Sequence, residues 1–179
     1  MCIRDRNNRH ITEILDWAVG LCKPAKVTVI TDDKSDIDYV RRLALQNGEE
    51  TALAIPGHTV HFDNYRDQAR DKNHTCVLLP KGKTLSKHIN AIDYDDGLEE
   101  IYGLMDGIMA GKEMLVRFFS LGPQNSLFSI PAMQITDSAY VAHSEDLLYR
   151  SGYEYFRRLP DDKEVFWMLH SSGLSLIHI

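Results

Sequence analysis

The segment between residues 65 and 75 holds the residue types best suited to chemistry on a small anion. It reads Tyr-Arg-Asp-Gln-Ala-Arg-Asp-Lys-Asn-His-Thr, with arginines at 66 and 70. A guanidinium binds carboxylate or phosphate well, because its planar fork offers two parallel N–H donors and keeps its charge. The residues alone leave a second interpretation open, in which Arg70 is a surface arginine paired with Asp67 or Asp71.

One segment resembles a nucleotide-binding pattern without completing it. Gly82-Lys83-Thr84 looks like the end of a phosphate-binding loop, but the full pattern requires a glycine at position 77, where valine stands. The segment also precedes a polar connection and not a clear helix. We therefore interpret it as an ordinary loop.

The histidines do not follow the spacing of a metal site. Three of them flank the arginine segment without any zinc signature, and no cysteine stands at ligand spacing: His58, His61 and His74. We expect His143 and His170 to serve packing or hydrogen bonding. The sequence therefore predicts no metal-binding residue in this chain.

Two polar turns invite a catalytic interpretation and a structural one. Asp137, between Thr136 and Ser138, could act as an acid or base, but we expect it to accept local backbone hydrogen bonds where a strand ends. Residues 120–126 contain Gly122-Pro123, which fits a tight turn between strands. The alternative, with amides of this turn facing an active-site cleft, is the less favoured one.

Taken together, three blocks resemble the N-terminal lobe of the GTP-dependent phosphoenolpyruvate carboxykinases. The first is Arg-Phe-Phe-Ser-Leu-Gly-Pro-Gln-Asn-Ser from residue 117, continued by Gln-Ile-Thr-Asp-Ser-Ala-Tyr-Val-Ala-His-Ser from residue 134. The second is the arginine segment at 65–75, and the third is Phe-Trp-Met-Leu-His-Ser-Ser-Gly at 166–173. Their order and spacing agree with the family, and the resemblance runs from about Asn8 to Gly173.

The resemblance implies a reaction and a role for one residue. Family members convert oxaloacetate and GTP into phosphoenolpyruvate, carbon dioxide and GDP with divalent metals, usually Mn²⁺ and Mg²⁺. A metal stabilises the enolate left by decarboxylation, and the enolate then takes the γ-phosphoryl group. By resemblance, Arg70 binds the carboxylates of oxaloacetate or phosphoenolpyruvate. The catalytic, nucleotide and metal residues belong to a C-terminal lobe that this chain lacks, so we expect the chain alone to be inactive.

Two other functions stay open. The chain could be a non-catalytic α/β module that binds a small carboxylate or phosphate anion. It could also be a structural domain in which acidic side chains pair with Arg70. Anion binding that depends on Arg70 would separate these two.

Periodicity and turn residues predict the elements that position these residues. Helical spacing or caps indicate helices at about 11–22, 35–48, 97–110 and 144–157. Apolar and β-branched runs indicate strands at 26–30, 75–79, 114–119, 128–135 and 165–169. The fold class is therefore α/β, a single incomplete lobe with a mixed β-sheet flanked by helices.

The two ends of the chain look foreign to the protein. Residues 1–6, Met-Cys-Ile-Arg-Asp-Arg, and residues 174–179, Leu-Ser-Leu-Ile-His-Ile, can be encoded by one short DNA sequence and its reverse complement. That DNA looks like a transposon end used in sequencing libraries. We expect residues 7–173 to be the native lobe between two adapter remnants, which are set aside in reasoning about the fold.

Composition excludes several classes of partner. The net charge of −6 gives no general basic field for nucleic acid, and no apolar run approaches a membrane span. Cys22 and Cys76 have no Cys-x-x-Cys spacing, so we expect buried thiols in a reducing compartment, the cytoplasm.

Overall fold

The computed structural model describes residues 8–62, 75–161 and 163–174. Its centre is a mixed sheet with the order β1-β6-β7-β9, in which the short β8 also pairs with β6. β6 runs parallel to β1 and antiparallel to β7, and β7 runs parallel to β9. The strands of this sheet are β1 (Lys26–Val29), β6 (Glu113–Leu121), β7 (Ile130–Thr136), β8 (Arg150–Ser151) and β9 (Phe166–His170).

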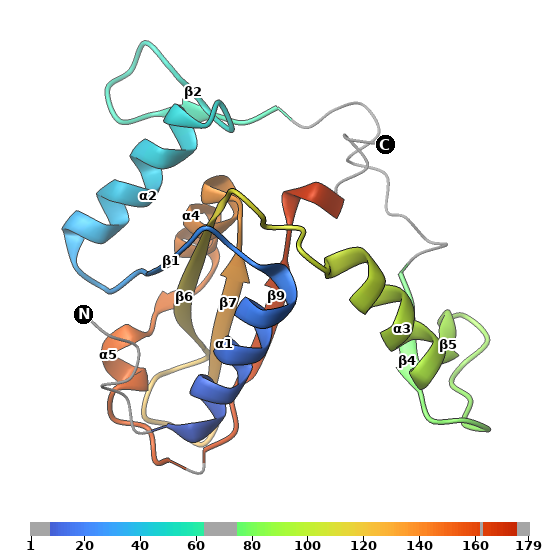
Figure 1. The fold of residues 1–179 in the computed structure, drawn as a ribbon. Helices are drawn as coiled ribbons and strands as arrows, with labels where there is room; N and C mark the ends of the chain where they lie inside the picture. Colours follow the sequence, from blue (N-terminus) through green and yellow to red (C-terminus); the bar gives the residue numbers. More distant parts are fainter. Residues whose placement is uncertain (1–7, 63–74, 162, 175–179) are drawn as a thin grey trace.

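Helices cover both faces of this sheet (Figure 1). α1 (Arg9–Cys22) packs on one face through its buried residues Ile11, Leu15 and Ala18. On the other face lie α2 (Lys34–Gln46) and α4 (Ala139–Leu148), while the short α5 (Tyr153–Phe156) follows β8. This confirms the predicted class, a mixed sheet flanked by helices.

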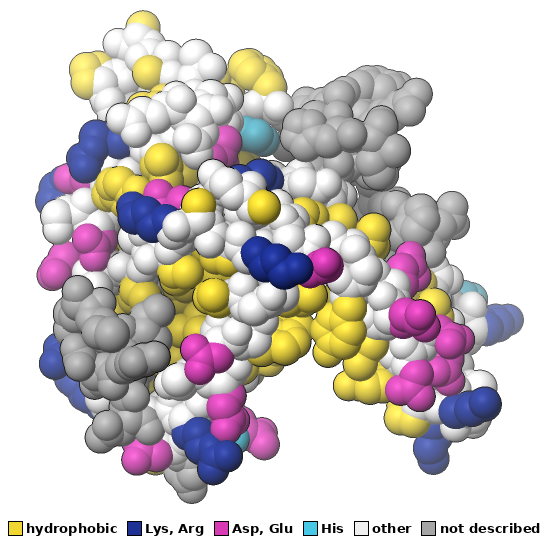
Figure 2. Space-filling view, in the orientation of Figure 1, with side chains coloured by type: hydrophobic (Ala, Val, Ile, Leu, Met, Phe, Trp, Pro, Cys, Tyr) yellow, Lys and Arg dark blue, Asp and Glu magenta, His cyan; other side chains and the backbone are white. Residues whose placement is uncertain are grey.

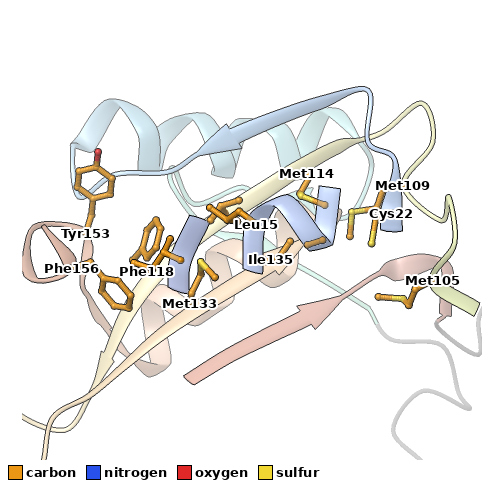
Figure 3. Close-up of a cluster of buried hydrophobic side chains, with 13 residues drawn as sticks. Leu15, Cys22, Met105, Met109, Met114, Phe118, Met133, Ile135, Tyr153 and Phe156 are labelled. Atoms are coloured by element: carbon orange, nitrogen blue, oxygen red, sulfur yellow. The ribbon is translucent and has the colours of Figure 1, made fainter. Parts of the chain in front are cut away.

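Alternation along the strands separates two cores. Met114, Val116 and Phe118 on β6 belong to the core under α1, together with Met133 and Ile135 of β7. Figure 3 shows Met114, Phe118, Met133 and Ile135 around that helix. Leu115, between Met114 and Val116, belongs to the opposite core, with Val40 and Ala44 of α2 and Ala139 and Ala142 of α4. Side chains alternate between the faces of a strand, so one apolar run supplies both cores.

Two small sheets stand away from the centre (Figure 1). A hairpin of β2 (Thr51–Ala52) and β3 (Thr59–Val60) follows α2. Further along, β4 (Val77–Leu79) pairs in parallel with β5 (Ala91–Asp93), and α3 (Tyr94–Met105) packs against both. We call β4, β5 and α3 the arm. Among the described residues, no helix is both long enough and apolar enough to cross a bilayer.

The predicted helix at 144–157 is wrong at its start and in its middle. The helix begins at Ala139, because Ser138 is its N-cap and accepts a hydrogen bond from the Val141 N–H. It ends at Leu148, and the chain then pairs with β6 as β8. At Gly152 an added Cβ would lie 2.7 Å from the carbonyl carbon of Phe119, so this close approach requires glycine.

Other helix boundaries differ in smaller ways. Ser35 does not cap α2, whose N-cap is Asp33. α3 begins before residue 97 and stops at Met105, because Asp106 is extended and Gly107 has a φ of +68°. α1, β1, β4, β6, β7 and β9 confirm the predicted elements to within a few residues, and Gly48 closes α2 with a positive φ.

Candidate functional site

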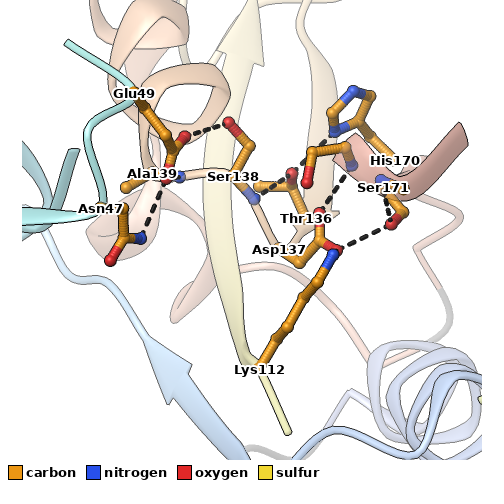
Figure 4. Close-up of polar contacts among 11 residues, drawn as sticks. Asn47, Glu49, Lys112, Thr136, Asp137, Ser138, Ala139, His170 and Ser171 are labelled. Atoms are coloured by element: carbon orange, nitrogen blue, oxygen red, sulfur yellow. Dashed lines mark hydrogen bonds and ion pairs between the residues drawn. The ribbon is translucent and has the colours of Figure 1, made fainter. Parts of the chain in front are cut away.

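The described polar residues that could take part in binding or catalysis lie together where β7 and β9 end (Figure 4). These strands are parallel, with Thr136 opposite His170. The carboxyl ends of parallel strands meet at one edge of a sheet, and this edge carries ligand sites in many α/β proteins. The N-terminus of α4 begins at the same edge, directly after Ser138.

Asp137 joins the ends of the two strands from a fully buried position. Its Oδ2 accepts hydrogen bonds from Lys112 Nζ and from Ser171 Oγ, both at 2.7 Å, and its Oδ1 accepts one from the Ser172 N–H at 2.7 Å. Burial by itself would raise the pKa of Asp137, but these donors together hold it below the usual value. The expected ordering role is therefore supported, although the donors come from other elements and not from the local backbone.

His170 lies at this edge, where burial favours its neutral form. Its Nδ1 lies 2.9 Å from Thr136 Oγ1, which also accepts a hydrogen bond from the Ser138 N–H. Burial lowers the pKa of His170, and the nearby carboxylates of Asp137 and Glu49 oppose that shift without cancelling it. This confirms the predicted hydrogen-bonding role of His170.

Glu49 fills the N-terminus of α4 from far away in the sequence. Its carboxylate accepts hydrogen bonds from Ser138 Oγ and from the N–H groups of Ala139 and Tyr140, at 2.5, 3.2 and 2.9 Å. A carboxylate is favourable at a helix N-terminus, because it accepts hydrogen bonds from N–H groups that have no partner inside the helix. It also lies at the positive end of the helix dipole. Sequence reasoning missed Glu49, because only the fold brings it to Ser138.

The residues around Glu49 attach the β2–β3 hairpin to α4. Glu50 lies 2.8 Å from His143 Nε2, and both side chains are buried. The ring of His61 stacks on Tyr140 at 3.7 Å between centroids, and its Nδ1 lies 2.5 Å from the backbone oxygen of Glu49. Of the three histidines flanking the arginine segment, the structure therefore brings His61 to this edge.

Arg70 and Arg66 lie outside the described residues, as does His74. The described chain stops at Phe62, directly after His61, and resumes at Thr75, before β4. Both flanks of the arginine segment are thus placed, and the role of Arg70 stays a prediction.

A second buried polar group lies between the sheet and α4. Arg117 on β6 is almost fully buried and forms an ion pair with Asp146, while Gln134 Nε2 donates to Glu145 Oε1 at 3.1 Å. Burial lowers the pKa of Arg117 to about 10, with Asp32 and Asp36 opposing the shift. A charge this deep in the fold requires its partners, so we interpret the group as part of the α4 interface.

The two turns considered from the sequence take ordinary turn geometry. Gly82 has a φ of +80°, and the N–H of Lys83 donates to the backbone oxygen of Pro80. Gly122 also has positive φ, and an added Cβ would lie 2.6 Å from the backbone oxygen of Phe128. These contacts support the structural interpretation of both segments.

The described residues do not fit a metal site. Within the three described ranges, no three side chains of His, Cys, Asp or Glu come together as possible metal ligands. Cys22 is buried, as expected, but Cys76 is exposed, which corrects the sequence prediction.

Comparison with known proteins identifies the family. The model of the phosphoenolpyruvate carboxykinase N-terminal domain matches residues 13–178. This chain belongs to that family. Proteins named phosphoenolpyruvate carboxykinase [GTP] are similar over most of the chain. The one from Pyrococcus abyssi is 54% identical over 93% of this chain, and the one from Thermococcus kodakarensis is 55% identical over the same share.

A more distant relative with the same name, from Chlamydia abortus, is 32% identical over 79% of the chain. The match covers 27% of the length of the Pyrococcus abyssi and Thermococcus kodakarensis relatives. This carboxykinase-family chain therefore spans about a quarter of the curated proteins that it resembles.

Proposed function

We propose that this chain is the N-terminal, substrate-binding portion of a GTP-dependent phosphoenolpyruvate carboxykinase. The parent enzyme would convert oxaloacetate and GTP into phosphoenolpyruvate, carbon dioxide and GDP in gluconeogenesis, in the cytoplasm. The observation that carries this proposal is the similarity to proteins of that name over 93% of the chain.

In this proposal Arg70 binds the carboxylates of oxaloacetate or phosphoenolpyruvate. A guanidinium that meets a carboxylate with two parallel N–H groups fixes both its position and its orientation. Positioning of this kind accounts for a large part of the catalysis of phosphoryl transfer.

The described residues would support Arg70 by fixing the two flanks of its segment. On one side His61 is held by Glu49 and by the ring of Tyr140. On the other side β4 is paired with β5 and covered by α3, whose Gly97 lies against Leu78. A segment whose two ends are attached to packed elements loses less entropy on binding a ligand.

We place the cofactors on the remainder of the parent polypeptide. GTP and the divalent ions Mn²⁺ and Mg²⁺ would bind there, as the family resemblance implies. In the same proposal, the hexapeptides at 1–6 and 174–179 are adapter remnants, and 7–173 is the native lobe.

The test is a chimera in which residues 7–173 replace the matching region of the Thermococcus kodakarensis relative, 55% identical to this chain. We expect GTP-dependent formation of phosphoenolpyruvate from oxaloacetate. The 179-residue chain alone should show none, and its activity would refute the assignment of nucleotide and metal binding to the remainder. A folded but inactive chimera that still binds oxaloacetate would favour the non-catalytic anion-binding module.

A further inference from the structure

β9 lies at the edge of the central sheet but has the composition of a central strand. It reads Phe-Trp-Met-Leu-His, and β7 is its one partner among the described strands. Apolar residues on both faces are typical of strands buried inside a sheet. Successive residues of a strand direct their N–H and C=O groups to opposite sides, so alternate residues of β9 present theirs away from β7.

This edge borders a hollow between the arm and the body, by which we mean the central sheet with the helices that cover it. Figure 2 shows hydrophobic side chains on both sides of that hollow. Trp17 of α1 connects the two sides, because its ring contacts Trp167 of β9 at 5.2 Å and Tyr102 of α3 at 6.1 Å between centroids. Ile101 lies one turn before the buried Met105 on α3 and is 41% exposed. We call Trp17, Ile101, Tyr102 and Trp167 the notch.

We propose that the notch receives a β-strand from the part of the parent polypeptide that this chain lacks, paired along the edge of β9 that faces away from β7. The inference rests on the proposed function, in which a longer carboxykinase contains this lobe. The relatives supply the necessary length, since the matched region is 27% of theirs. The strand would carry apolar side chains toward Trp167 and Tyr102, and its backbone would pair with the outward N–H and C=O groups of β9.

A single strand suits this place better than a second copy of the chain. The edge of β9 lies beside the arm, which is attached to the same body through α1 and α3. To pair with β9, a second copy would have to place its own β9, its whole sheet and its arm beside this edge. One added strand covers both the sheet edge and the apolar wall of α3.

Residue-resolved hydrogen exchange in the chimera tests the pairing without reference to activity. If a strand occupies the edge, the amides of consecutive β9 residues should all exchange slowly. In the 179-residue chain, alternate amides should exchange at least ~100-fold faster than their neighbours, because no described strand pairs with them. The same alternation in the chimera would overturn the proposal. Protection in the chain alone that grows with its concentration would assign the edge to a second copy instead, and so would also overturn it.

Ile101→Lys tests the apolar wall. The substitution should lower the melting temperature of the chimera clearly more than that of the 179-residue chain, because only in the chimera would the lysine be buried. Leu147→Lys, on α4 and 82% exposed, is the matched control. Equal shifts for Ile101→Lys in chimera and chain would contradict the proposed strand. Since neither measurement needs Arg70 or turnover, a failure here leaves the proposed function standing, and an inactive chimera leaves this test intact.

Discussion

The carboxylate of Glu49 accepts a hydrogen bond from the N–H of Tyr140 at 2.9 Å, across 91 positions of sequence. The same carboxylate reaches Ser138 and Ala139, so the first turn of α4 depends on a residue that follows α2. This contact ties the segment after α2 to the N-terminus of α4, directly after the end of β7.

Glu49→Ala should loosen the first turn of α4. The Ala139 and Tyr140 amides would lose their acceptor, and the helix would lose a favourable negative charge at its N-terminus. We expect these amides to exchange about tenfold faster in the chimera, corresponding to a cap contribution of about 1.4 kcal/mol. Glu100→Ala, at an exposed position on α3, is the control. Unchanged exchange at both amides would show that Ser138 alone suffices as the cap.

His170 should make the fold less stable in mild acid. Its folded-state pKa lies below the ordinary value of 6.5, so the unfolded chain takes up a proton first as the pH falls. The contribution of neutral His170 to the free energy of unfolding is therefore complete above about pH 7. It is lost as the pH falls through 6.5 toward the folded-state pKa.

His170→Gln should reduce the loss of stability between pH 7.5 and pH 5.5, measured as the melting temperature of the chimera. His58→Gln, in the exposed hairpin turn, controls for histidine removal in general. NMR titration of the His170 ring supplies the direct check. A ring that titrates at or above 6.5 would contradict the predicted direction.

Arg70→Ala should impair the chimera in its use of oxaloacetate. Loss of a charge-assisted, bidentate contact and of the positioning that it gives should cost on the order of 2–4 kcal/mol in kcat/KM. Arg70→Lys should recover only part, because an ammonium cannot present two parallel donors. The affinity for GTP should barely change.

A surface ion pair would give a different result for the same variants. It would be worth roughly 0–1 kcal/mol of stability and nothing to catalysis. Steady-state kinetics with oxaloacetate as the varied substrate decides between the two. A wild-type kcat/KM in Arg70→Ala would show that another residue binds the carboxylates.

The isolated lobe, residues 7–173, should be poorly stable. Its described surface leaves Phe166 54% exposed on an edge strand, and Leu127 and Phe128 are largely exposed between β6 and β7. Exposed sheet edges and apolar surface favour association. Size-exclusion chromatography and thermal melting test this. A monodisperse monomer with a cooperative, high melting transition would contradict the prediction.

Local sequence patterns predicted the elements whose bounds are set by neighbouring residues. The apolar runs of β6 and β9 and the stop of α1 before Pro24 need only periodicity and the backbone limits of proline. The start of α4 was missed because Ser138 caps the helix together with Glu49, and no local signal records a partner so far away. The break at Gly152 was missed for the same reason, since it depends on the backbone of Phe119.

The candidate site was predictable to a lesser extent. The hydrogen-bonding roles of His170 and Asp137 followed from their places at strand ends. The partners that define those roles, Lys112 and Ser171, come from separate elements and required the fold. The assignment of Arg70 depends on resemblance and on the proposed enzyme.

The chain contains two tryptophans, and both belong to the notch. Trp17 and Trp167 touch each other edge to face, so the intrinsic fluorescence of the protein reports almost entirely on this one place. Both rings are partly open to water in the described structure. Covering them would shift the emission to shorter wavelength and shield it from a soluble quencher. In this chain, tryptophan emission would therefore report, without any added label, whether the notch is covered.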